Sequence, residues 1–127
     1  EVFAPGIVSK EGHQAKLSLT PDGTCIIFMS MNIIPGQENE TSGREISFIS
    51  IKMKDSIWDK PTVLSFSRDF INDEPSLSYN GERLFFVSNR PENGSAEAQK
   101  MPDIWMVTNL GKEWSDPQNI GEPVNTD

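Results

Sequence analysis

Short apolar runs, each closed by turn residues, recur along this chain and predict strands rather than helices. Cys25–Ser30 and Leu84–Ser88 are almost unbroken apolar runs. Runs of this length fit strands that are covered on both faces. The sequence shows no long 3.6-residue apolar period, and its nine prolines and nine glycines interrupt any candidate helix. The pattern therefore predicts an all-β chain.

The same pattern occurs twice, 58 positions apart. The segment LSLTPDGTCIIFMSMN at 17–32 aligns with PSLSYNGERLFFVSNR at 75–90. The alignment continues to Ile46 and Ile104 and then slips by two residues. A repeat of this length indicates one supersecondary unit that has been copied.

Each copy predicts four antiparallel strands and one tight turn. Asp22-Gly23 and Asn80-Gly81 favour a turn between the first two strands, because Gly accepts positive φ and Asp or Asn tolerates it. The apolar phase changes between Phe48 and Ile49, which indicates a β-bulge near Phe48. The predicted strands are 16–20, 25–30, 45–53 and 62–66 in the first copy, and 74–78, 84–88, 103–108 and 118–121 in the second.

Repeated four-stranded antiparallel units without helices are typical of β-propeller blades. A stacked solenoid is the alternative, but solenoid repeats are usually shorter and parallel. We favour two four-stranded propeller blades that form part of a larger β-propeller. The predicted division is a lead-in or closing strand at 1–15, a blade at 16–73, and at 74–127 a second blade with the start of the next.

Composition narrows the possible functions. The 127 residues fit one domain, and the net charge of −8 argues against nucleic acid, which needs a basic face. The chain has no apolar stretch of the length that membrane insertion needs. It holds one cysteine and one histidine, so we predict no disulfide, metal site or cofactor.

Both copies resemble the TolB-type, WD-like β-propeller repeat, whose core reads Ser-Pro-Asp-Gly, an apolar strand and Ser-Asn-Arg. The segments DIWM at 103–106, GKEWSDP at 111–117 and NIG at 119–121 resemble the rest of that repeat. The resemblance covers nearly the whole chain. It implies a periplasmic or secreted protein of a bacterium and says little about activity.

Two blades do not close a propeller, which needs at least four. In addition, Val124–Asp127 resembles Ile71–Glu74, the lead-in to the second copy. We therefore expect partners for these blades: further blades in the same chain, or other copies in a homo-oligomeric ring.

Strand topology separates two ends of the units. Connections from first to second and from third to fourth strand share one end and are short, whereas the long connections 32–44, 66–73 and 90–102 share the other. Long loops on a rigid scaffold tend to carry binding residues, although exposed loops are polar by default. The candidate ligand-binding residues at the long-loop end are His13, Arg68, Asp69, Asp73, Glu74, Asn89 and Arg90.

Other singled-out residues are predicted to be structural. Trp58 and Trp114 occupy matched places, which favours packing over stacking on sugar rings. Asp103 is expected to bond backbone groups where its strand starts, as its sequence partner Glu45 could in the first copy. The predicted structural motif is Asp22, Gly23, Asn80, Gly81, Asp103, Trp58 and Trp114.

These observations predict a non-catalytic β-propeller module that binds a protein or carbohydrate ligand. No nucleophile, base and orienting group can be named together, so we lean against an enzyme. The alternative is part of a propeller enzyme that acts on oligosaccharides or accompanies a peptidase or hydrolase domain.

Overall fold

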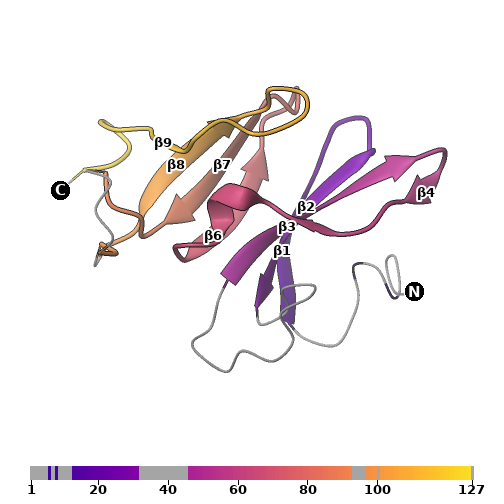
Figure 1. Cartoon of the computed structure of the whole chain (residues 1–127). Helices are drawn as coiled ribbons and strands as arrows, with labels where there is room; N and C mark the ends of the chain where they lie inside the picture. The colour runs from indigo at the N-terminus through magenta and orange to yellow at the C-terminus, as the bar shows by residue number, and fades with distance from the viewer. Residues whose placement is uncertain are drawn as a thin grey trace.

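The computed structural model describes residues 6, 8, 13–31, 46–92, 97–99 and 101–126. These residues form two antiparallel sheets and one short 3₁₀ turn, shown in Figure 1. The all-β, antiparallel prediction is confirmed. No helix in this part of the chain has the length and apolar character of a membrane span. The elements are β1 (His13–Leu19), β2 (Cys25–Met31), β3 (Ile46–Lys54), β4 (Ile57–Trp58), β5 (Thr62–Val63), η1 (Ser65–Ser67), β6 (Asn72–Leu77), β7 (Arg83–Ser88), β8 (Asp103–Thr108) and β9 (Gln118–Asn119).

The two sheets share one strand order. In the first sheet β1, β2 and β3 lie side by side, and β3 pairs with both β4 and β5. In the second sheet the order is β6-β7-β8-β9. The hairpin that contains β4 has a counterpart in the second sheet, where a single bridge joins Asn109 and Trp114. The predicted four strands of each copy are thus present, with one added short strand in the first.

Strand pairing places the two-residue slip between the copies earlier than the sequence suggested. Phe28 pairs with Ile49 in the first sheet, and its equivalent Phe86 pairs with Trp105 in the second. Ile104 is therefore equivalent to Phe48 rather than to Ile46. The extra residues of the first copy lie between β2 and β3.

The predicted bulge near Phe48 is wrong. The β2–β3 ladder runs without a shift from Cys25 opposite Lys52 to Met31 opposite Ile46. The change of apolar phase has another cause, because Phe48 and Ile49 are buried on opposite faces of one regular strand. A strand covered on both faces has no polar side to define a phase.

Irregular pairing occurs instead at equivalent places in β1 and β6. The register of β1 shifts between Ala15 and Ser18, and that of β6 shifts between Asp73 and Ser76. Lys16 and Glu74 lie within these shifts with φ values of 55° and 51°, a left-handed conformation uncommon for residues other than glycine. The repeat therefore extends to its backbone irregularities.

Each sheet has two faces, which we name from their residues. The leading face carries Ile26, Phe28, Ile49 and Ile51 in the first sheet, and the equivalent Leu84, Phe86, Trp105 and Val107 in the second. The trailing face carries Ile27, Met29 and Phe48 in the first sheet, and the equivalent Phe85, Val87 and Ile104 in the second.

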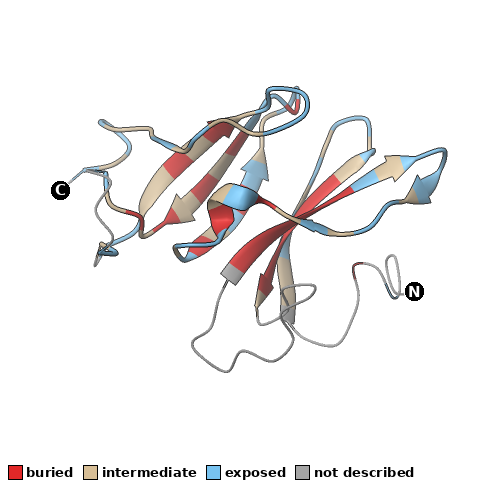
Figure 2. Ribbon diagram, in the orientation of Figure 1, coloured by how far each residue is buried: buried red, intermediate tan, exposed pale blue. Residues whose placement is uncertain are grey.

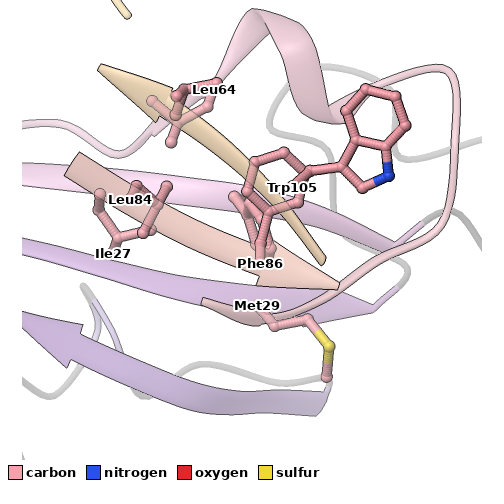
Figure 3. Close-up of a cluster of buried hydrophobic side chains, with 8 residues drawn as sticks. Ile27, Met29, Leu64, Leu84, Phe86 and Trp105 are labelled. Carbon is pink, nitrogen blue, oxygen red and sulfur yellow. The ribbon is translucent and has the colours of Figure 1, made fainter. Parts of the chain in front are cut away.

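The main core lies between the sheets and joins unlike faces. The trailing face of the first sheet packs on the leading face of the second, together with Leu64 from the connection between the sheets. Figure 3 shows Ile27 beside Leu84, with Phe86 and Trp105 farther along the same cluster. Phe48 meets Phe86 edge-on with ring centroids 5.6 Å apart. The packing is thus head to tail, as repeated units pack in an array.

A second, smaller cluster covers the leading face of the first sheet. There Val8 packs with Ile26, Phe28, Ile49 and Ile51, all of them buried. Figure 2 shows buried positions along the central strands of both sheets. The trailing face of the second sheet differs, because Phe85, Val87 and Ile104 are only half-buried.

Candidate functional site

A groove of about 610 Å³ opens between the two sheets at the end where the tight turns lie. Its lining comes from the β1–β2 turn, from β2 and β3, from the β6–β7 turn and from the loop after β8. Figure 1 shows the β1–β2 turn and the loop after β8 at the upper ends of the two sheets. The short connections therefore share one end, as the topology predicted. This groove is the candidate site that the described residues present most clearly.

The two tight turns form one wall of the groove and are built alike. Gly23 and Gly81 take φ values of 70° and 71°, which suits glycine. A Cβ on Gly81 would lie 3.7 Å from side-chain atoms of both Thr20 and Pro21, so the turns lie against each other. The prediction that Asp22-Gly23 and Asn80-Gly81 form turns is confirmed.

The turns differ in the group that accepts their hydrogen bonds. Asp22 Oδ1 accepts from the amide of Thr24 at 3.0 Å and from the hydroxyls of Thr24 and Thr20. These donors hold the pKa of the Asp22 carboxyl below its usual value of 3.8, the hydroxyl of Thr20 contributing most. Asn80 Oδ1 accepts from Ser78 Oγ and from the amide of Glu82 in the same way.

Lysines from both sheets line the groove. Lys52 comes from β3 and Lys112 from the loop after β8, and both also line an adjoining hollow that includes Lys60. Within the described residues Lys16 and Glu74 form the only ion pair, so these three lysines have no carboxylate within ion-pairing distance. Asp22, Asp59 and Glu113 also line the groove or the hollow. The groove lining is thus neutral in charge, within a chain of net charge −8.

The lysines are not needed to form the repeat. Strand pairing makes Lys52 equivalent to Thr108, since Cys25 opposite Lys52 corresponds to Arg83 opposite Thr108. The loops before Trp58 and Trp114 have the same length, which makes Lys112 equivalent to Ser56. Sequence reasoning missed both lysines, and their departure from the repeat is the signal that was available.

Trp114 lines the groove and also packs on the core between the sheets, whereas Trp58 packs on the cluster over the leading face of the first sheet. Both side chains are half-buried. Both tryptophans thus pack in part on apolar residues of the fold. Trp105 is buried between the sheets, and its indole nitrogen has no hydrogen-bond partner.

Arg90, predicted as a ligand-binding residue, is 7% exposed and bonded inside the fold. One guanidinium nitrogen donates to the backbone oxygen of Phe66 at 2.9 Å and to Asn72 Oδ1 at 2.8 Å, and Nε donates to Ser88 Oγ. Burial lowers the pKa of Arg90 to about 10, although the charge of Asp69 opposes this change. These bonds join β7 to the connection between the sheets.

Three aromatic rings enclose the same guanidinium. Its carbon lies 5.1 Å from the ring centroid of Phe86, 5.4 Å from that of Trp105 and 5.7 Å from that of Phe70. Such contacts stabilise a desolvated cation. Nε, one terminal nitrogen and the faces of the Arg90 guanidinium are therefore occupied by this chain.

The other predicted ligand-binding residues lie near the start of β6 and the end of β7, away from the groove. Arg68 and Asp69 are exposed just after η1. Asp73 Oδ1 accepts from the amide of Glu74, and Asn89 Oδ1 accepts from the amide of Ile71 at 3.0 Å. Glu74 pairs with Lys16, and this pair raises the pKa of the exposed Lys16.

His13 begins β1, opposite Met31, and its side chain lies outside the described residues. The structure thus gathers most of the predicted residues at one end, where several bond within the chain. Their binding of a ligand stays a prediction.

Asp103 bonds differently from the prediction. Its Oδ2 accepts from the side-chain amide of Asn119 at 3.0 Å rather than from backbone groups. Its equivalent by strand pairing is Ser47, whereas Glu45 lies outside the described residues. Asn119 comes from the adjacent strand β9, so the bond to Asp103 joins β8 to β9.

No group of three or more His, Cys, Asp and Glu side chains in the described part of the chain is placed to hold a metal ion. Cys25 is half-buried in the groove, and its Sγ lies 3.6 Å from Ser50 Oγ. Thr20 and Thr24 donate their hydroxyls to Asp22. The chemistry on offer in the groove is therefore hydrogen bonding and charge from lysines.

Comparisons with protein-family models, with curated proteins and with solved structures found no match for this chain.

Proposed function

We propose that this chain supplies two blades of a β-propeller and serves as a non-catalytic binding module for a protein or glycan. The observation that carries the proposal is a groove between two equivalent sheets, lined by lysines that the repeat does not require. Ligands tend to bind where rigid elements meet and leave a concave surface with a few polar groups.

The propeller part of the proposal is supported by the head-to-tail core. In a propeller each four-stranded blade packs one face on the next blade around the ring. Here the trailing face of the first sheet covers the leading face of the second. The inner strands β1 and β6 also approach each other, because the amide of Leu77 donates to Ser18 Oγ at 2.9 Å. The resemblance to the TolB-type repeat agrees with this arrangement and favours a periplasmic or secreted location.

The binding part is supported by the free charges in the groove. A lysine without a carboxylate partner is available to an anionic group of a ligand, and the half-buried Trp114 offers an aromatic surface beside it. Acidic sugars and acidic peptides both carry such groups. The hydroxyls of Thr20 and Thr24 bond within the turn, which favours binding over nucleophilic catalysis.

Isothermal titration with hexagalacturonate, with the neutral sugar maltohexaose and with a hexaglutamate peptide tests this function. We expect one of the acidic probes to bind. The double variant Lys52→Thr, Lys112→Ser carries the residues that the other copy has at these positions, so we expect it to fold and to bind at least about tenfold more weakly, or 1.4 kcal/mol.

The matched control is Lys54→Thr, which removes one charge from the same strand outside the groove lining. We expect this control to change the affinity by less than about twofold. The proposal is wrong if no probe binds at concentrations up to about 10 mM, or if the double variant binds as the parent chain does.

A further inference from the structure

The trailing face of the second sheet has the same make-up as a face that is buried elsewhere in this chain. Ile27, Met29 and Phe48 are buried against the second sheet. Their equivalents Phe85, Val87 and Ile104 form an apolar patch that is only half-buried. The chain therefore contains a template for what covers this patch, namely a leading face such as that of its own first sheet.

The strands β1 and β6 carry the residues needed to repeat the polar contact that joins the two sheets. Ser18 Oγ accepts from the amide of Leu77, and the leucine side chain packs on the core. At the open end Ser76 is the equivalent of Ser18 and is exposed. On the first sheet Leu19 is the equivalent of Leu77, and it is 47% exposed. Both halves of the contact are thus present and unused.

The charges of the inner strands also match. Lys16 and Glu74 occupy equivalent places and form an ion pair across the two sheets. Suppose that a second copy docks on the second sheet in the way that the two sheets dock within one chain. Lys16 of the second copy would then lie beside Glu74 of the first copy. Opposite charges would then alternate along the inner strands. A pair of identical residues at this repeat position would instead repel.

We propose that the trailing face of the second sheet binds a second copy of this chain, through the leading face of that copy's first sheet. The inference rests on the proposed propeller and names the partner and the two surfaces. The contact is heterologous, because the two surfaces differ, so successive copies form a ring when the rotation closes.

Val8 occupies part of the surface that the second copy would use. It is 7% exposed and packs with Ile26, Phe28, Ile49 and Ile51. A docking sheet and Val8 therefore compete for the same apolar residues. Removing the side chain of Val8 from this surface should strengthen association, whereas most substitutions of a buried valine only weaken a fold.

Sedimentation velocity over a range of chain concentrations tests the proposal. We expect the parent chain to associate, and Val87→Glu to weaken the association at least about hundredfold, because the charge would be buried without a partner. Met106→Glu alters the same face, where its equivalent Ser50 is buried, and guards against a folding defect peculiar to position 87. Leu110→Glu is the control, since Leu110 is 61% exposed and its equivalent in the first sheet, Lys54, lies outside the core between the sheets.

Val8→Asp should raise the association constant, while circular dichroism shows that the strands persist. A charge exchange gives a second readout, since Lys16→Glu with Glu74→Lys keeps the ion pair within one chain. We expect such chains to associate with themselves better than with the parent, because mixed contacts place like charges together.

A chain that stays monomeric as parent and as Val8→Asp overturns the proposal, as does association that Val87→Glu and Met106→Glu leave unchanged. The titrations with acidic probes can be run on the monomeric Val87→Glu variant, so binding in the groove is judged independently of assembly.

Discussion

The two sheets of this chain are built on one pattern, yet their equivalent faces lie in different surroundings. The trailing face of the first sheet is in the core, whereas that of the second is half-exposed. Both faces carry apolar side chains in the same register. Burial is therefore decided by what stands opposite a face, and the sequence of a repeat specifies only that the face suits burial.

The sheets also differ in how the chain leaves them. After β5 the chain forms η1, and Ser67 Oγ accepts from the amide of Phe48 at 3.0 Å. After β9 the chain turns back, and Asn125 bonds both the amide and the carbonyl of Ile104, the equivalent of Phe48. Two different side chains thus satisfy the same backbone position.

The largest test of this comparison uses two neighbouring phenylalanines on opposite faces of β7. Phe86 is buried against Phe48 and Phe66, and Phe85 lies on the open trailing face. We expect Phe86→Ala to lower the free energy of unfolding by about 3–5 kcal/mol, because it leaves a cavity in the core. Phe85→Ala should cost roughly 1 kcal/mol at low chain concentration, because less apolar area is lost. Urea unfolding measures both.

The concentration dependence of the Phe85→Ala result adds a check. If the open face is covered in an assembly, the cost of Phe85→Ala should rise with chain concentration, while that of Phe86→Ala stays constant. Equal costs for both variants in the dilute monomer would mean that another segment covers the trailing face, and the comparison of the two faces would fail.

Much of the fold was predictable because its signals are local. Glycine at Gly23 and Gly81 and the apolar runs of β2 and β7 specify turns and strands within a few residues. The bulge near Phe48 was predicted wrongly because a strand buried on both faces has no polar side from which to read a phase. The real irregularities at Lys16 and Glu74 leave no apolar signature.

The candidate site was less predictable because it depends on contacts between the sheets. Asn72 looked like a loop residue, yet it is fully buried and its side chain donates to two backbone oxygens. Arg90 looked like a surface cation, and only the aromatic rings around it explain its burial. Lys52 and Lys112 come from different sheets and line the same groove, and the sequence of neither segment alone predicts that.

A smaller test concerns the two side chains that accept hydrogen bonds from equivalent backbone amides, Phe48 in β3 and Ile104 in β8. Ser67 is fully buried, so Ser67→Ala leaves the amide of Phe48 without its acceptor and should cost about 2 kcal/mol. Asn125 is half-buried, so water can replace part of its bonding, and Asn125→Ala should cost about 1 kcal/mol. Urea unfolding gives the costs, and amide hydrogen exchange gives their location.

Amide hydrogen exchange should become faster at Phe48 in Ser67→Ala and at Ile104 in Asn125→Ala. Neither variant should change the exchange rate at the other amide. Uniformly faster exchange in either variant would show that the side chain supports the whole fold rather than one strand, and the two devices would then not be local equivalents.

The smallest effect is expected from the acceptor side chain of the tight turns, which is a carboxylate at Asp22 and an amide at Asn80. Hydrogen bonds from Thr20 and Thr24 lower the pKa of Asp22 in the folded chain, so the folded state favours the ionised form. The stability that Asp22 contributes is therefore complete above its unfolded pKa of 3.8 and is lost as the pH falls through the lower folded value. Asn80 shows that an amide builds the same turn, so Asp22→Asn should fold and be slightly less stable near neutral pH.

Melting temperatures of the parent chain and of Asp22→Asn, measured from neutral pH down into the acid range, check this prediction. The two curves should converge as Asp22 becomes protonated, because a neutral carboxyl loses the charge-assisted part of the three bonds. A gap that persisted at the lowest pH would mean that the shape of the side chain matters in the first turn and its charge does not. The two turns would then differ in energy for a reason other than charge.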